Sequence, residues 1–156
     1  MSEDPADIRN WLRLSDKLTT SGCLTPADPT RLAAIGTAHV INLAMEDHPE
    51  ALDNAAQHMA AAGLAYSHIP VPFDAPELAH YDAFAAALEN ATRPVHVHCI
   101  MNWRVSAFLC RYHREHGMAD TEALALMHRI WQPDREPYPQ AEIWAAIALG
   151  EGTQWV

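Results

Sequence analysis

Hydrophobic positions along the first hundred residues follow two periods. Three compact apolar runs are typical of strands buried between helices: 38–43, 64–71 and 93–98. The two stretches between them are rich in Ala, Leu or Met at helical spacing: 49–62 and 76–90. Because strands and helices alternate, the pattern predicts right-handed crossovers and a parallel sheet covered on both faces.

The remaining segments extend this picture. Residues 11–20 alternate briefly before Ser21 and Gly22, which predicts one or two short edge strands. Four further helices are indicated: 31–35, 105–116, 120–131 and 140–149. The expected fold class is therefore α/β, a three-layer sandwich whose mostly parallel sheet has four to five strands. We expect one domain over residues 1–156, with a flexible start (1–10) and a C-terminal helical part (118–156) packed on the same core.

Composition narrows the classes of function. Twenty acidic residues against ten basic ones give a net charge of -10, which disfavours nucleic acid and anionic membranes as partners. No segment has about 18 uninterrupted apolar residues, and the N-terminus does not resemble a secretory signal, so a soluble, cytoplasmic protein is expected. Three cysteines without CxxC spacing suggest neither a disulfide framework nor a zinc site, and the scattered histidines suggest no other metal. Any bound anion must meet a local positive site.

The segment most indicative of chemistry follows the strand at 93–98. It reads His98-Cys99-Ile100-Met101-Asn102-Trp103-Arg104-Val105-Ser106. Ligands of open parallel sheets bind beyond the carboxyl ends of the strands. A loop that enters a helix N-terminus there points backbone N–H groups at an anion and favours the reactive thiolate form of a cysteine.

Individual side chains in this segment fit such a site. The guanidinium of Arg104 offers parallel donors to the same anion, and Asn102 tolerates the left-handed backbone of a tight loop. Ser106 is placed to hydrogen-bond the Cys99 sulfur. The alternative is that Cys99 is a small buried hydrophobic residue, the usual fate of a free cysteine. Its charged and polar neighbours favour the functional interpretation, whereas Cys23 and Cys110 lack such neighbours and are interpreted as structural.

His-Cys, a short loop, Arg and a nearby Ser resemble the signature of cysteine-dependent phosphatases of the tyrosine and dual-specificity class. Together with the strands around it, the segment is similar to the small phosphatase-like family found alone or fused to beta-lactamase-like hydrolases. The resemblance implies a dual-specificity-phosphatase-like fold, no metal or organic cofactor, and a phosphorylated small molecule or phosphoprotein as partner. It also implies roles for four residues: Cys99 as nucleophile, Arg104 as phosphate clamp, His98 tuning the thiolate and Ser106 assisting the leaving sulfur. The intervening residues of the segment would form the anion-binding loop.

Asp74 is the candidate general acid, because it follows a strand about where this class keeps that aspartate. It equally suits the cap of the helix that begins near Pro76.

One departure keeps three functions open. Only four residues separate Cys99 from Arg104, one fewer than in phosphatases of this class and the number found in sulfur-transferring rhodaneses. If Ser106 is held in register, Val105 takes the usual arginine position, which favours a binding module without catalysis. The sequence therefore predicts a phosphatase, with a persulfide-carrying sulfurtransferase and a phosphate-binding pseudophosphatase as alternatives.

The tryptophans near the C-terminus also allow two interpretations. Trp131 and Trp144 fall at helical apolar positions, so the core is their expected place, although they could roof the anion pocket. A homodimer is the alternative for the strip formed by Trp144, Ile147 and Leu149, with Trp155 beyond it.

Overall fold

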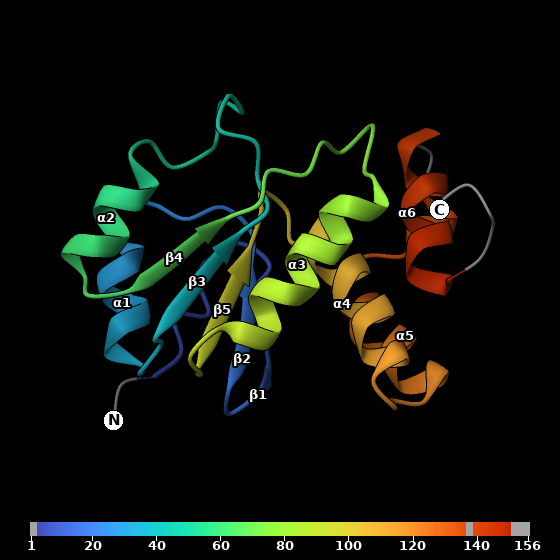
Figure 1. The fold of residues 1–156 in the computed structure, drawn as a ribbon, viewed down its shortest axis with the longest axis horizontal. Helices are drawn as coiled ribbons and strands as arrows, with labels where there is room; N and C mark the ends of the chain where they lie inside the picture. The colour runs from blue at the N-terminus through green and yellow to red at the C-terminus, as the bar shows by residue number, and fades with distance from the viewer. Residues whose placement is uncertain (1–2, 137–138, 151–156) are drawn as a thin grey trace.

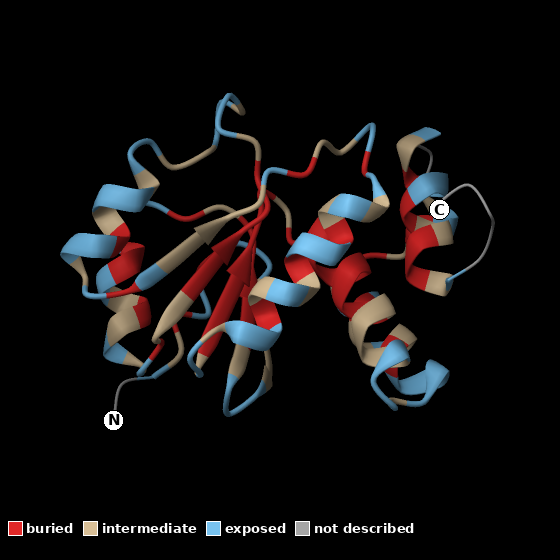
Figure 2. Ribbon diagram, in the orientation of Figure 1, coloured by how far each residue is buried: buried red, intermediate tan, exposed pale blue. Residues whose placement is uncertain are grey.

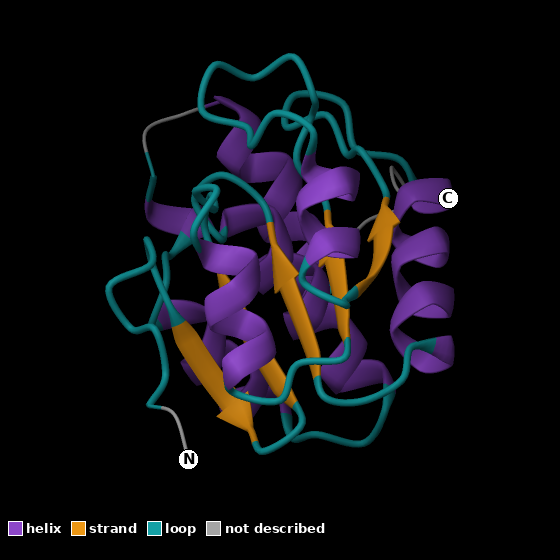
Figure 3. Ribbon diagram, turned by 90° about the vertical axis from the view of Figure 1, so that its left-hand side faces the viewer, coloured by secondary structure: helices purple, strands orange, loops and turns teal. Residues whose placement is uncertain are grey.

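A computed structural model describes residues 3–136 and 139–150. One sheet with the strand order β1-β2-β5-β3-β4 separates two layers of helices (Figure 1, Figure 3). The strands are β1 Leu12–Ser15, β2 Leu18–Ser21, β3 His39–Asn42, β4 Ala65–His68 and β5 Val95–His98. The helices are α1 Asp28–Ala34, α2 Ala55–Ala61, α3 Leu78–Asn90, α4 Trp103–Glu115, α5 Asp120–His128 and α6 Pro139–Leu149, with a 3-10 turn at Pro133–Arg135. The predicted three-layer α/β sandwich is confirmed.

The sheet places β5 at its centre. β5 pairs in parallel with β2 on one side and with β3 on the other, while β1 joins β2 in antiparallel fashion at the edge. All four residues of β5 are buried. The carboxyl ends of the parallel strands therefore meet at one edge of the sheet, where the chain leaves β5 at Cys99.

The two faces of the sheet differ in chemistry. Val95 and Val97 belong to the larger core, which is built with residues of α3, α4, α5 and α6. Figure 2 shows the central strand β5 coloured as buried. His96 and His98 alternate with them and point to the other face, since successive side chains of a strand point to opposite sides. The smaller core on that face includes Leu32 of α1.

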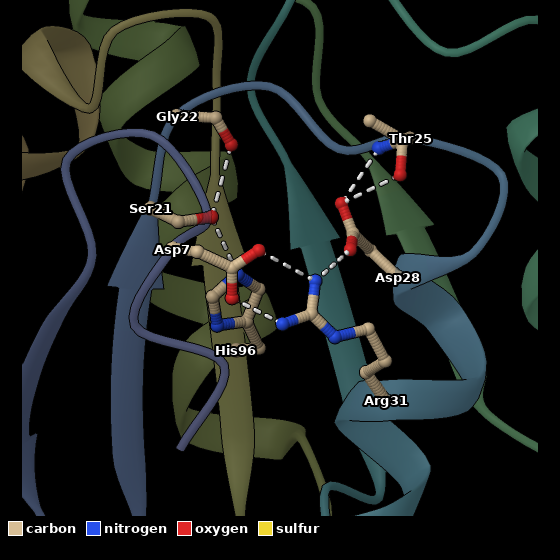
Figure 4. A network of polar contacts seen from close by, with 7 residues as sticks. All are labelled: Asp7, Ser21, Gly22, Thr25, Asp28, Arg31 and His96. Atoms are coloured by element: carbon tan, nitrogen blue, oxygen red, sulfur yellow. Dashed lines mark hydrogen bonds and ion pairs between the residues drawn. The ribbon is translucent and has the colours of Figure 1, made fainter.

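His96 anchors a polar network beneath the N-terminal segment (Figure 4). Its Nδ1 and Nε2 each lie 2.8 Å from a hydroxyl, of Thr19 and Ser21 respectively. Because Ser21 donates its one proton to the Gly22 carbonyl, Nε2 donates to Ser21 and Nδ1 accepts from Thr19. Burial holds the pKa of His96 well below its ordinary value, so the ring is neutral.

Several predicted boundaries need correction. The helix expected over 49–62 begins only at Ala55, because Pro49 lies in a turn and Asn54 adopts a left-handed backbone with φ 55°. β4 is shorter than the predicted 64–71, and as an edge strand it is half-buried rather than buried on both faces. α5 ends at His128, three residues before the expected Trp131.

The two ends of the chain pack on the domain as far as they are described. Residues 1–10 are predicted to be flexible, yet Ile8 is buried and Asp4 forms an ion pair with Arg13. Residues of α5 and α6 belong to the larger core, with Trp144 and Ile147 fully enclosed. The dimer interpretation is therefore wrong for those two side chains, and Trp155 lies outside the described residues. Within the described ranges, none of the helices is both long and apolar enough to cross a membrane.

Candidate active site

The side chain of Asn102 fixes the turn that follows β5. This residue occupies the N-cap position of α4 with φ 66°, so it uses the left-handed backbone that the sequence led us to expect. Its buried Nδ2 donates to the Asn10 carbonyl and to the Thr20 hydroxyl, each at 2.9 Å. The loop is thus tied both to the N-terminal segment and to β2.

Two carbonyl groups of the loop accept hydrogen bonds from residues outside the loop. The Ile100 carbonyl accepts from the Cys23 amide at 2.9 Å, and the Met101 carbonyl accepts from Asn10 Nδ2 at 2.8 Å. In a trans peptide unit the N–H points opposite to the C=O. The amides of Met101 and Asn102 therefore point away from Cys23 and Asn10, the donors that these carbonyls bind.

Cys99 and Arg104 line one hollow of about 350 Å³. Its other walls come from three segments of the chain: Met45, Asp47 and His48 after β3, Phe73 after β4, and Ile100, Met101 and Trp103 beside Cys99. The structure thus brings the predicted thiol and guanidinium together at the carboxyl edge of the sheet.

Arg104 reaches the hollow from the first turn of α4, although only four residues separate it from Cys99. Its side chain is buried, and Nη1 donates to the Val71 carbonyl at 2.8 Å. Val105, which takes the usual arginine position if Ser106 is held in register, is completely buried in the larger core. The short loop therefore presents an arginine to the hollow.

His98 contributes no positive charge to this site at neutral pH. The residue is buried at the end of β5, and this burial lowers the pKa of its imidazole from 6.5 to about 4. Its Nδ1 lies 3.5 Å from the Cys99 carbonyl, and its buried Nε2 has no partner among the described residues. His98 therefore carries no positive charge with which to stabilise a Cys99 thiolate, the role expected for it.

Ser106 does not contact the Cys99 sulfur as expected. Its hydroxyl donates to the Trp103 carbonyl at 3.0 Å, one turn back along α4. A hydroxyl has only one proton to donate, so this bond leaves none for the sulfur. Ser106 instead lines a small crevice on the β1 side of α4, together with Leu12 and Leu109.

Asp74 lies outside the hollow. The residue is exposed in the segment between β4 and α3, and its neighbour Phe73 lines the hollow in its place. Its alternative role as a helix cap is wrong, because Glu77 caps α3 through a reciprocal pair of bonds with His80. A catalytic role for Asp74 stays a prediction without a position in the hollow to support it.

Besides Phe73, three lining residues were not predicted: Met45, Asp47 and His48. They belong to the irregular segment after β3, part of which the hydrophobic pattern assigned to a helix. The signal that points to them is topological. β3 is the parallel neighbour of β5, so its following loop must emerge beside Cys99.

Aromatic rings form one wall of the hollow. Trp103 stacks on Trp131 with ring centroids 4.7 Å apart and an interplanar angle of 2°. Phe73 stacks on Trp144 at 5.9 Å, and the Trp144 indole donates to the Phe73 carbonyl at 2.8 Å. The C-terminal tryptophans therefore belong to the core and also support the two aromatic residues that face the hollow.

The sequence model of a family described as "Beta-lactamase hydrolase-like protein, phosphatase-like domain" matches residues 9–110. The chain belongs to this family. The match includes the loop from Cys99 to Arg104 and both strands that flank β5. No curated protein matches the sequence.

Solved structures of phosphatases share the fold of this phosphatase-like domain. A DUF442 protein of Shewanella putrefaciens CN-32, described as a phosphatase, is 23% identical with a TM-score of 0.77, over 94% of this chain and 95% of its own. TpbA of P. aeruginosa, solved as a cysteine-to-serine variant in complex with pTyr, is 18% identical with a TM-score of 0.69, over 97% and 96% of the two chains. The PP-IP phosphatase SIW14 of S. cerevisiae is 11% identical with a TM-score of 0.68, over 88% and 84%. At these identities the likeness is one of fold, and the domain is structurally similar to cysteine-dependent phosphatases.

Proposed function

We propose that this domain hydrolyses a phosphomonoester through a cysteinyl-phosphate intermediate. The observation that carries the proposal is the hollow that Cys99 and Arg104 line together at the start of α4. In the reaction the Cys99 thiolate attacks phosphorus, the bond to the leaving oxygen breaks, and water then releases inorganic phosphate.

The surroundings of the hollow support binding of a phosphoryl group. The amides of Met101 and Asn102 point away from their neighbouring carbonyls, and the first turn of α4 adds the positive end of its dipole. The Arg104 guanidinium keeps donors beyond its bond to Val71, since one Nη1 hydrogen bond uses only part of the fork. Together these groups supply the local positive site that a chain of net charge -10 needs.

The aromatic wall supports an aryl phosphate as the substrate class to test first. Phe73 and Trp103 both face the hollow, and flat rings of this kind pack against an aromatic leaving group. The complex of the Pseudomonas relative with pTyr agrees with such a substrate. A phosphorylated residue of a protein and a small aryl phosphate share this chemistry.

A phosphomonoester assay tests the proposal. Purified protein is given p-nitrophenyl phosphate, and phosphate release is compared with that of Cys99→Ser, which keeps the size of the side chain but lacks the thiolate. Turnover that disappears in Cys99→Ser supports the proposal. Equal release by the two proteins contradicts it.

Sulfur transfer is the second candidate, favoured by the four residues between Cys99 and Arg104. In that reaction the Cys99 thiolate takes the outer sulfur of thiosulfate, releases sulfite, and passes the sulfur to cyanide or a thiol. Intact mass after incubation with thiosulfate decides the matter. A mass increase of one sulfur atom that is absent in Cys99→Ser supports sulfur transfer, and an unchanged mass removes it.

A further inference from the structure

Phosphoryl transfer to the Cys99 thiolate needs a proton donor in addition to the nucleophile and the Arg104 guanidinium. As the bond between phosphorus and the leaving oxygen breaks, negative charge grows on that oxygen, and an acid at the site must neutralise it. Any assignment of this acid rests on the proposed function. The acid must face the hollow that Cys99 lines.

The segment that contains Asp74 is held in a shape that keeps this carboxylate outside. The Val71 carbonyl is bound by Arg104, and the Phe73 carbonyl is bound by the Trp144 indole, each at 2.8 Å. The Phe73 ring also stacks on Trp144. Asp74 directly follows these two fixed points and is exposed, so the segment delivers a phenyl ring rather than a carboxyl group to the hollow.

Asp47 supplies the carboxyl group that does line the hollow. It sits in the turn after β3, and the base of that turn is anchored to the sheet. The Leu43 amide donates to the His98 carbonyl of β5 at 2.8 Å, and the Ala44 amide donates to Asn42 Oδ1 at 2.8 Å. The first bond holds the beginning of the turn beside the end of β5, next to Cys99, and the second fixes the turn to the end of β3. Asp47 is also exposed, so solvent reaches its carboxyl group.

His48 lines the same hollow, but one of its ring nitrogens is already engaged as an acceptor. Its Nδ1 accepts a hydrogen bond from the Glu50 amide at 3.0 Å, which requires an unprotonated Nδ1 and leaves the proton on Nε2. A ring in this tautomer donates a hydrogen bond to a substrate oxygen rather than a full proton. The remaining lining residues, apart from Cys99 and Arg104, carry no acidic group in their side chains.

We propose that Asp47 is the catalytic proton donor of this domain. As the Cys99 sulfur forms its bond to phosphorus and the bond to the leaving oxygen breaks, the Asp47 carboxyl group gives its proton to that oxygen. In the second half of the reaction the Asp47 carboxylate takes a proton from water. The oxygen of that water bonds to phosphorus, the sulfur–phosphorus bond breaks, and the Cys99 thiolate and inorganic phosphate are released.

A series of aryl phosphates with leaving groups of increasing basicity tests this assignment. A nitrophenolate leaves with little help, whereas an unsubstituted phenolate needs a proton. We expect Asp47→Asn to lower kcat/KM for phenyl phosphate by about 100-fold or more and for p-nitrophenyl phosphate by much less. The fall of kcat/KM on the alkaline side of the pH profile should also disappear, because it reports loss of the donor's proton. Asp82→Asn, which removes an exposed carboxylate on α3, is the matched control.

The outcomes separate this inference from the proposed function. If the wild-type protein shows Cys99-dependent turnover but Asp47→Asn keeps both its leaving-group dependence and its pH profile, Asp47 is not the donor. The same conclusion follows if Asp74→Asn, rather than Asp47→Asn, gives the selective loss on phenyl phosphate. Absence of any Cys99-dependent turnover in the wild-type protein contradicts the proposed function and overturns the assignment with it.

Discussion

Nη1 of Arg104 donates to the backbone carbonyl of Val71 at 2.8 Å, and both residues are buried. This bond joins the first turn of α4 to the segment after β4, so the guanidinium is aimed before any ligand arrives. Preorganised donors of this kind stabilise developing negative charge without having to reorient during the reaction. The bond also connects the helix that follows the Cys99 loop to the segment that carries Phe73.

Arg104→Lys tests this role. Lysine keeps the charge but cannot bind Val71 and an anion at once with a planar fork, so we expect affinity for inorganic phosphate to fall by roughly 10- to 100-fold. Isothermal titration with phosphate measures the effect. Arg13→Lys is the matched control, since Arg13 lies on the edge strand β1 and forms an ion pair with Asp4. Unchanged phosphate affinity in Arg104→Lys would show that the guanidinium does not hold the anion.

Replacements of Asn102 separate backbone strain from tethering. Asn102→Gly adopts the left-handed φ of 66° without strain but loses both hydrogen bonds of Nδ2. Asn102→Ala loses the same bonds and is in addition strained at this φ. We expect both variants to be destabilised, the alanine by about 1 kcal/mol more. Urea unfolding measures the difference.

Asn54 provides the matched comparison, because it is exposed at the N-cap of α2 with a similar φ of 55° and its side chain makes no capping hydrogen bond. Asn54→Ala should be less stable than Asn54→Gly by a similar amount, while Asn54→Gly itself should stay close to the wild type. If Asn102→Gly were as stable as the wild type, the two hydrogen bonds would not hold the loop.

Gly22 directly follows β2 and lies against the loop between Cys99 and Arg104. A Cβ added there would lie 2.5 Å from the Ile100 carbonyl oxygen, and a backbone atom of the loop cannot yield without moving the loop itself. We expect Gly22→Ala to lower the free energy of unfolding by about 1–3 kcal/mol and to lower turnover as well. Gly63→Ala has no atom within 4 Å of its added Cβ and should pay only the strain of φ +79°, with turnover intact. Normal turnover in Gly22→Ala would contradict this account of the contact.

The hydrophobic pattern was sufficient to predict the layers of the fold. Runs such as 38–43 and 93–98 enter a sheet only as strands covered on both faces, and the observed β3 and β5 lie within them. The pattern failed where tertiary position decides the outcome. An apolar run does not reveal that β4 lies at the edge, and a helical period over 49–62 does not reveal that Asn54 ends the preceding loop.

Sequence alone predicted Cys99 and Arg104 as residues of one site, but not Asp47, which also lines the hollow. Cys99 and Arg104 are close in sequence, so one loop and one helical turn were enough to place them together. Asp47 lies more than fifty residues away and joins them only because β3 pairs with β5, a pairing that local sequence does not encode. The direction of the Ser106 hydroxyl depends on a local bond to the Trp103 carbonyl, which competes with any contact to the sulfur.

Buried histidines should make the fold sensitive to acid. The pKa of His98 is lowered from 6.5 to about 4, so the unfolded chain binds a proton in this range while the folded protein does not. The stability that neutral His98 supports is therefore complete above pH 6.5 and is lost as the pH falls toward 4, by about 3 kcal/mol at most.

Thermal unfolding of the wild type and of His98→Gln between pH 4 and pH 7 checks this expectation. The wild type should lose stability more steeply on acidification than His98→Gln, although His96 still contributes to the slope in both proteins. Parallel curves for the two proteins would show that His98 is not the proton-sensitive group.

The covalent intermediate is the central claim, and rapid-quench mass spectrometry tests it most directly. Protein mixed with an excess of p-nitrophenyl phosphate and quenched in acid within the first turnovers should carry the mass of one phosphoryl group, located on the peptide that contains Cys99. Cys99→Ser treated in the same way should carry none. Release of p-nitrophenol by the wild-type protein with no phosphoryl group on Cys99 at any quench time would contradict the account.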